Sequence, residues 1–261
     1  MSFKSSFDGF VIIHAPFACP ERRIHFEKEL PRVGVDTFSV AEARPVDGRD
    51  CRLRNYVGSS QAILSLTDGF VTAVDLAESA GWNSVVIMED DVAFRRTFAS
   101  LWAEVEDEVR DTNWGILTLH RKPCDGSFLT PEPVLSRTAL VPIFHNTGNY
   151  CVIVKSAFYS AFRHSLQICV DRGYPCDFFY GVFSELSGPH IFATNRNLTG
   201  QAPGLASTLT PRPVRRRSFY SRFRSAPWPQ CLVLNPLHSV YISARSLLTS
   251  AGDAHGNVRP A

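Results

Sequence analysis

The chain has 261 residues, of which 44% are hydrophobic, and a formal net charge of +2. This composition is typical of a folded protein with a substantial core and argues against a disordered chain. No apolar stretch approaches the roughly 20 residues that a membrane-spanning helix needs. The N-terminus does not have the pattern of a secretory signal. Seven scattered cysteines without a Cys-x-x-Cys pair fit reduced thiols, so we expect a cytoplasmic protein.

Predicted strands and helices alternate along the first part of the chain. We predict a buried strand over 10–13, a helix over 20–30 and a second strand over 36–40. Apolar residues at three- and four-residue steps predict a long helix over 59–81. The apolar run 84–88 then predicts a third strand. This alternation is typical of an α/β domain with a mainly parallel central sheet.

The second part of the chain contains further elements and then changes in composition. We predict strands over 115–119, 150–154 and 190–194 and helices over 156–170 and 177–186. Beyond Gln201, prolines and arginines dominate. We therefore expect one domain over 1–207 and a basic, Pro/Arg-rich C-terminal extension over 208–261.

The net charge conceals a strong asymmetry. Residues 186–252 contain eight arginines and no Asp or Glu, which leaves −6 for residues 1–185. Within the cluster Arg212–Arg224, aromatic residues are interleaved with the arginines, a mixture that suits contact with an anionic membrane surface. Single-stranded nucleic acid and a plain disordered tail are the alternatives. We do not expect nucleic acid to be the partner.

Three carboxylates in a row, Glu89, Asp90 and Asp91, directly follow the predicted strand at 84–88. In α/β sheets ligands bind beyond the carboxyl ends of the strands. Magnesium and manganese prefer oxygen ligands and usually take one or two protein carboxylates together with phosphate. On an extended backbone, Glu89 and Asp91 are expected to point one way and Asp90 the other. A solvated strand end is the alternative.

Short segments in a fixed order carry a resemblance to a known family. They are Val-Ile-Ile-His at 11–14, Pro-Glu-Arg-Arg at 20–23, Pro-Val-Asp-Gly at 45–48, Val-Val-Ile-Met-Glu-Asp-Asp-Val at 85–92, Trp-Gly-Ile-Leu-Thr-Leu at 114–119, Gly-Asn-Tyr-Cys-Val-Ile at 148–153, Tyr-Pro-Cys-Asp at 174–177 and Gln-Ala-Pro-Gly-Leu-Ala-Ser at 201–207. In this order they resemble glycosyltransferase family 25, the galactosyltransferases of bacterial lipooligosaccharide synthesis and collagen modification. The chain departs from the family at His14-Ala15, where Asn-Leu is usual, and at Ser65-Leu66, where Ser-His is usual.

The resemblance implies a Rossmann-like, GT-A-type fold and transfer, with inversion, of a sugar such as galactose from a UDP-sugar donor to a glycan or lipid-linked acceptor. Glu89, Asp90 and Asp91 occupy the place of the Asp-x-Asp motif. We therefore expect Mn²⁺ or Mg²⁺ there, with Asp91 as a direct ligand, and Glu89 and Asp90 sharing metal and ribose contacts. His190 is a candidate for completing the metal shell. The two departures motivate an alternative: a catalytically inactive nucleotide- or glycan-binding module on the same fold.

Residues of the two early loops are candidates for binding the nucleotide. His14 follows the first strand, and Arg22 or Arg23 suits phosphate because guanidinium makes bidentate contacts with oxyanions. For either arginine, a solvated helix face is the alternative. Asp47 is a candidate for binding ribose or base, although Asp-Gly is also a common turn pair.

Transfer with inversion also needs a base to take the proton of the acceptor hydroxyl, and a carboxylate is the expected group. Asp177 is the first candidate, because its segment matches the family pattern. Its alternative role is the N-cap of the helix predicted to follow. Glu185, near the end of that helix, is the second candidate. Gln201 and Ser207 are weaker candidates for contact with donor or acceptor.

Overall fold

The computed structural model describes residues 2–16, 19–44, 60–121, 138–144, 146, 148–172, 174, 176–202 and 205. All of them fall within one compact unit, made up of 1–122 and 132–214. The predicted extension over 208–261, with its arginine cluster, lies outside the described residues, as do Asp47 and Ser207.

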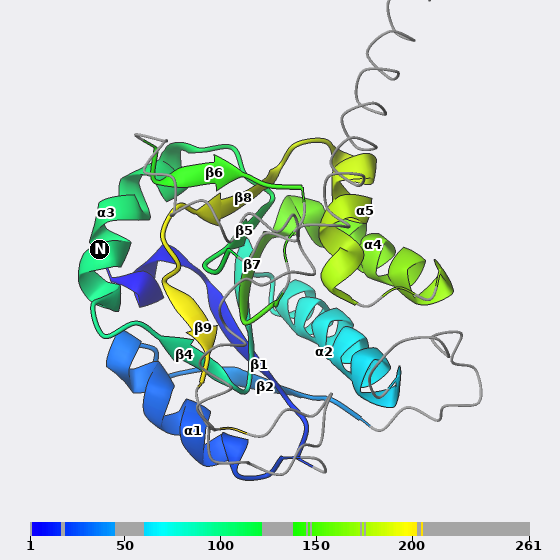
Figure 1. The fold of residues 1–261 in the computed structure, drawn as a ribbon, viewed down its shortest axis with the longest axis horizontal. Coiled ribbons are helices and arrows are strands. Elements are labelled where there is room, and N and C mark those ends of the chain that lie inside the picture. Colours follow the sequence, from blue (N-terminus) through cyan, green and yellow to red (C-terminus); the bar gives the residue numbers. More distant parts are fainter. Residues whose placement is uncertain are drawn as a thin grey trace, which may run out of the picture. The chain divides into compact units, whose positions relative to one another are not determined.

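A seven-stranded sheet in the order β2-β1-β3-β7-β5-β8-β6 forms the centre of this unit (Figure 1). Its strands are β1 (Gly9–His14), β2 (Ser39–Glu42), β3 (Ser84–Glu89), β5 (Ile116–Thr118), β6 (Leu140–Pro142), β7 (Cys151–Lys155) and β8 (Ile191–Thr194). β1 pairs in parallel with β2 and β3, and β5 with β8, whereas β7 and β6 run antiparallel to their neighbours. Five of the seven strands thus share one direction, which confirms the predicted α/β class with a mainly parallel sheet.

Helices cover both faces of the sheet (Figure 1). α1 (Arg22–Glu29) and α3 (Phe98–Asp111) pack on one face, and α2 (Ser60–Ser79), α4 (Tyr159–Arg172) and α5 (Phe179–Ser187) on the other. Short 3₁₀ helices are η1 (Phe3–Ser6), η2 (Leu30–Val33), η5 (Ser156–Phe158) and η6 (Cys176–Phe178). This layered arrangement is Rossmann-like and consistent with a GT-A-type fold. None of the helices in the described part of the chain is long and apolar enough to span a bilayer.

The side chains of β3 show why this segment forms a central strand. Val85 and Ile87 pack into the core on the side of α2, α4 and α5, whereas Val86 and Met88 pack into the core on the side of α1 and α3. All four are fully buried. A strand covered on both faces is a continuous apolar run, as the sequence has it. The register of β3 therefore fixes where the carboxylates that follow it emerge.

Helix α3 and the small sheet of β4 (Val92–Phe94) and β9 (Thr199–Gln201) are not among the elements predicted from sequence. The buried residues of α3 do recur at helical steps: Phe98, Leu101, Trp102, Val105 and Val109. Trp102 packs edge-on against Phe3 with ring centroids 4.9 Å apart, which joins the N-terminal turn to this helix. A helical pattern was therefore present in the sequence, between two strands.

Gly9, the first residue of β1, lies against the Trp82 ring. A Cβ added at Gly9 would lie 2.0 Å from a ring carbon of Trp82. Since that ring cannot move without disturbing the core, we expect Gly9→Ala to lower the free energy of unfolding by about 1–3 kcal/mol. Gly200→Ala is the matched control, because a Cβ there meets nothing within 4 Å. Urea denaturation of both variants tests this, and equal losses would contradict it.

Candidate active site

The acidic triplet lies where β3 ends and the chain turns into β4. The strand stops at Glu89, and Asp90 and Asp91 form the turn that leads to β4. The expectation that Asp90 points away from Asp91 is wrong, because both side chains reach Arg22. The extended backbone of β3 ends at Glu89, so the alternation of side chains between the two faces does not continue to Asp90 and Asp91.

Arg22, in the first turn of α1, bridges the two aspartates. Its Nη1 donates to Asp90 Oδ1 at 2.6 Å, and its Nη2 lies 3.2 Å from Asp91 Oδ2. All three side chains are at least nine-tenths buried. Burial would lower the pKa of Arg22, but the carboxylates of Asp91 and Asp90 raise it. A charged guanidinium thus compensates two buried carboxylates.

Asp90 is fully engaged by the protein. In addition to Arg22, His14 at the end of β1 places its Nδ1 2.8 Å from Asp90 Oδ2. His14 is itself buried. Arg22 and His14 were predicted to bind the nucleotide, but the structure directs both toward the carboxylate of Asp90. Asp90 therefore holds β1, α1 and the turn together.

Asp91 differs from Asp90 because only one of its two oxygens is bonded to described residues. Gln201 of β9 donates to Asp91 Oδ2 at 2.9 Å, and the Ala202 backbone N–H donates to the Asp91 carbonyl at 2.7 Å. Asp91 Oδ1 is buried and accepts no hydrogen bond from any described residue. Burial raises the pKa of Asp91, while Arg22 and Gln201 act against that rise. Among the buried polar atoms of the described residues that have no partner, this one belongs to a carboxylate, which makes it a candidate contact for a cation.

Two further carboxyl groups influence this region. Burial raises the pKa of Glu89 well above its usual value, and the charges of Asp91, Asp177 and Asp90 add to that rise. Burial, assisted by Glu89, Asp91 and Asp177, also raises the pKa of Tyr150 to about 12. The charges of Asp91 and Asp177 both act on Glu89 and on Tyr150, so these three carboxyl groups lie in one acidic region although they come from distant parts of the chain.

Asp177 lies in η6, before α5, and is held by the loop that precedes β7. The side-chain amide of Asn149 donates to Asp177 Oδ1 at 2.8 Å, and Gly148 N–H lies 3.3 Å from Oδ2. Asn149 is completely buried. The alternative role of Asp177 as cap of the following helix is not observed, because the N-cap of α5 is Phe178 and has no side-chain cap bond. The carboxylate is instead fixed toward the carboxyl edge of β3.

The structure does not bring three predicted site residues to this region. Arg23 pairs with Glu27 at 2.9 Å on the exposed surface of α1. Glu185 is exposed on α5, eight residues after Asp177, which is about 12 Å along a helix. His190 precedes β8 at the amino edge of the sheet, where its Nδ1 lies 3.4 Å from the Asn113 carbonyl. We omit these three from the site.

Sequence reasoning assigned no role to Asn149 or Tyr150 and only a weak one to Gln201. All three lie in segments that carried the family resemblance, at 148–153 and 201–207. Their segments are folded onto the acidic turn: Glu89 N–H donates to the Tyr150 carbonyl at 3.2 Å, and Gln201 reaches Asp91. These contacts join residues more than 50 positions apart, so a local pattern does not show them.

The residues fit a divalent cation only in part. In the described ranges, no group of three His, Cys, Asp or Glu side chains is placed to hold a metal ion, so the expected shell of Glu89, Asp91 and His190 is not assembled. A cation that uses one protein carboxylate and donor phosphates needs fewer protein ligands. Asp91 Oδ1, buried and without a donor, fits such a cation, and the charges of Glu89 and Asp177 would favour it.

The raised pKa of Glu89 gives a prediction for stability. When folding raises the pKa of a carboxyl group, ionisation of that group destabilises the folded state. This destabilisation is absent at pH values below the pKa in the unfolded chain. It reaches its full size at pH values above the pKa in the folded protein. We expect Glu89→Gln to increase the free energy of unfolding at about pH 8, and the gain to disappear toward about pH 4. The exposed Glu185→Gln is the control and should change stability by less than about 0.5 kcal/mol. A gain that is independent of pH would contradict the explanation.

Comparisons with known proteins do not identify a family for this chain. No family model matches the sequence, and no curated protein matches it. The crystal structure of A197 from STIV is similar at a TM-score of 0.36 and 12% identity, over 70% of this chain and 79% of that one. The apo structure of mouse xyloside xylosyltransferase 1 is similar at a TM-score of 0.34 and 9% identity, over 70% and 83%. At these scores neither likeness bears on activity, and membership in family 25 stays a prediction.

Proposed function

We propose that the protein is a glycosyltransferase, which moves a sugar from a nucleotide-sugar donor to a glycan or lipid-linked acceptor. The observation that carries this proposal is the buried Asp91 carboxylate, one oxygen of which accepts no hydrogen bond from a described residue, at the carboxyl edge of β3 and in one acidic region with Asp177. It supplies the two groups that sugar transfer needs, one for the donor phosphates and one for the acceptor proton.

On the donor side, Asp91 is the residue that would hold Mn²⁺ or Mg²⁺, with Glu89 as its neighbour. When bound, such an ion stabilises the charge of the leaving pyrophosphate. Arg22 and His14 act indirectly, because they fix Asp90 and thereby the turn that carries Asp91. The UDP donor, galactose as its sugar and inversion at the anomeric carbon rest on the family resemblance.

On the acceptor side, Asp177 is the proposed base. As the acceptor oxygen forms its bond to the anomeric carbon, the bond from that carbon to the pyrophosphate oxygen breaks, and the hydroxyl proton passes to a carboxylate oxygen of Asp177. Asn149 and Gly148 hold this carboxylate with two N–H groups, which fixes its position.

Exposed aromatic residues flank Asp177 and favour a glycan as acceptor. Tyr174 is 42% and Phe178 47% exposed, and their ring centroids lie 5.5 Å apart. An exposed pair of large apolar rings marks a binding surface more often than a single exposed ring does. The C–H face of a sugar ring packs well on such a surface. A lipid-linked acceptor, a cytoplasmic location and membrane contact through Arg212–Arg224 remain parts of the proposal drawn from the sequence.

The second candidate function is a nucleotide- or glycan-binding module without catalysis. It is favoured by the fact that protein groups engage both oxygens of Asp90 and one oxygen of Asp91. Calorimetry with UDP and manganese, followed by assays of sugar release from several nucleotide sugars, separates the two functions. Binding of UDP without release of any sugar would favour the module.

Asp91→Asn tests the donor site. Because the amide cannot replace the anionic oxygen, we expect donor hydrolysis or transfer to fall by about 10²–10³-fold while the fold is retained. Circular dichroism and thermal unfolding check the fold, and Glu185→Gln is the matched control with unchanged activity. Activity that is retained both in Asp91→Asn and in the presence of EDTA would contradict the proposed role of a metal ion.

Asp177→Asn tests the base. We expect kcat to fall by about 10²–10⁴-fold with the KM for the donor unchanged, since this residue acts on the acceptor proton. The pH profile supplies a second measurement: the acidic limb of kcat in the wild type should be absent from the variant. A variant that keeps both its kcat and the acidic limb would exclude Asp177 as the base.

A further inference from the structure

Tyr150 belongs to the short segment that joins the acidic turn to Asp177. Two residues of this segment, Gly148 and Asn149, contact the Asp177 carboxylate. Tyr150 comes next and lies opposite Glu89, because Glu89 N–H donates to the Tyr150 carbonyl at 3.2 Å and extends the antiparallel pairing of β3 with β7 by one residue. Side chains of directly opposed residues are neighbours in such a pair. Tyr150 is thus close to carboxyl groups on both sides of the candidate site.

The Tyr150 side chain has packing contacts on two sides. A Cβ added at Gly148 would lie 3.1 Å from the Tyr150 hydroxyl oxygen and 2.8 Å from a ring carbon, so the phenol lies against this glycine. Gly148 has a φ of 87°, a conformation that favours glycine, and its N–H lies 3.3 Å from Asp177 Oδ2. The ring also packs edge to face against His120, which follows β5, with centroids 4.9 Å apart. The hydroxyl therefore lies beside the backbone that holds Asp177.

The Tyr150 hydroxyl is a hydrogen-bond donor among acceptors. Burial, assisted by the charges of Glu89, Asp91 and Asp177, raises the pKa of Tyr150 to about 12, so the hydroxyl keeps its proton at neutral pH. An ionised carboxylate only accepts hydrogen bonds, whereas a phenol also donates one. The side chain is half-buried, and its hydroxyl forms no hydrogen bond with any residue that the structure describes. A phenol in this setting suits a ligand that offers a hydroxyl oxygen.

The transferred sugar has to lie between the pyrophosphate and the acceptor, because its anomeric carbon exchanges a bond to one for a bond to the other. The proposed function assigns Asp91 to the donor phosphates and Asp177 to the acceptor proton, and the charges of both carboxyl groups act on Tyr150. We propose that Tyr150 recognises the transferred sugar, with its hydroxyl donating a hydrogen bond to a hydroxyl oxygen of that sugar. This inference rests on the proposed function and adds to it a residue that determines which sugar is accepted, since a site that bonds a substrate hydroxyl discriminates against analogues without it.

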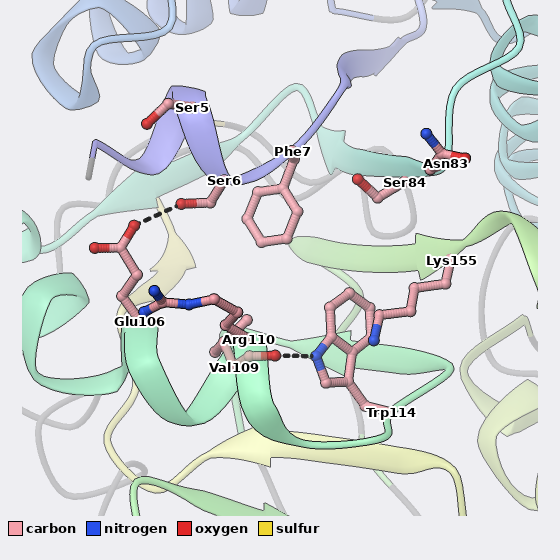
Figure 2. A pocket seen from close by; sticks show the side chains of 10 residues that line it. All are labelled: Ser5, Ser6, Phe7, Asn83, Ser84, Glu106, Val109, Arg110, Trp114 and Lys155. Atoms are coloured by element: carbon pink, nitrogen blue, oxygen red, sulfur yellow. Dashed lines mark hydrogen bonds between the residues drawn. The ribbon is translucent and has the colours of Figure 1, made fainter.

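A pocket elsewhere in the molecule is not a suitable place for this sugar. Figure 2 shows the pocket, of about 330 Å³, with Ser84 and Lys155 in its lining. Ser84 begins β3 and Lys155 ends the antiparallel strand β7, so the pocket lies at the amino edge of the sheet. The six residues of β3 separate this edge from the acidic turn by about 20 Å. A sugar does not extend that far from a pyrophosphate held at Asp91.

The test separates binding of the sugar from binding of the nucleotide. Calorimetry of the whole chain with manganese compares UDP with UDP-galactose, UDP-glucose and UDP-N-acetylglucosamine. For the donor that binds most tightly, the ratio of its affinity to that of UDP measures the contribution of the sugar. We expect Tyr150→Phe, which removes a single hydroxyl, to lower this ratio by about three- to tenfold and to leave the affinity for UDP unchanged.

Tyr159→Phe is the matched control and should leave the ratio unchanged. The Tyr159 hydroxyl donates to the Trp82 carbonyl at 3.2 Å, just before the amino end of β3. Thermal unfolding checks that both variants are folded. If Tyr150→Phe keeps the wild-type ratio, or loses affinity for UDP as much as for the donor, the role of Tyr150 is overturned while the proposed function stands. A wild type that binds none of the three donors would overturn the proposed function, and this role of Tyr150 with it.

Discussion

The ion pairs between Arg22 and the two aspartates at 90 and 91 are the interaction on which the candidate site depends. Two carboxylates at this depth are unfavourable without a compensating charge, because burial removes them from water. The guanidinium of α1 supplies that charge with short contacts to both residues. The position of α1 on the sheet and the course of the chain from β3 into β4 are thus set by the same contacts. A fold that loses this arginine retains two buried carboxylates without their cation.

The same region also contains more negative charge than a stable core needs. The charges of Asp91 and Asp177 raise the pKa of Glu89, and the guanidinium of Arg22 is committed to the turn. Such an arrangement is unfavourable for the isolated protein and favourable once a cation or a proton is delivered. Strongly perturbed groups of this kind concentrate at functional sites. The excess of negative charge is therefore an argument for a ligand, and stability alone does not explain it.

The sequence predicts the central part of the fold well because its signals are local. β1, β3 and α2 each show a periodic or continuous apolar pattern, and the structure confirms them within two residues at each end. Helix α3 has an equally regular apolar pattern, although it is not among the predicted elements. The sequence also predicts the correct edge of the sheet for the acidic triplet. The triplet directly follows a buried strand, so it lies at the carboxyl end of that strand, where α/β sheets bind ligands.

Contacts between distant segments were beyond the reach of those patterns. The bond from Asn149 to Asp177 joins a loop before β7 to η6, and the bond from Gln201 to Asp91 depends on the pairing of β9 with β4. His190 was expected at the site but lies elsewhere. It begins a predicted strand, and the parallel pairing of β8 with β5 puts the start of that strand at the amino edge of the sheet, opposite the acidic turn. To place His190 correctly, one needs the order and direction of the strands in the sheet, which the spacing of residues along the chain does not reveal.

The bond from Gln201 to Asp91 has a consequence for the order of events at the site. With Oδ2 engaged, Asp91 has a single oxygen left for the proposed cation, so this residue would bind the ion through one contact. One such contact gives weak affinity for a free hydrated ion, whereas an ion that arrives already chelated by two phosphates brings most of its coordination with it. If the proposed function holds, the contact of β9 with Asp91 would favour entry of metal and donor as one complex, and departure of the metal together with the nucleotide.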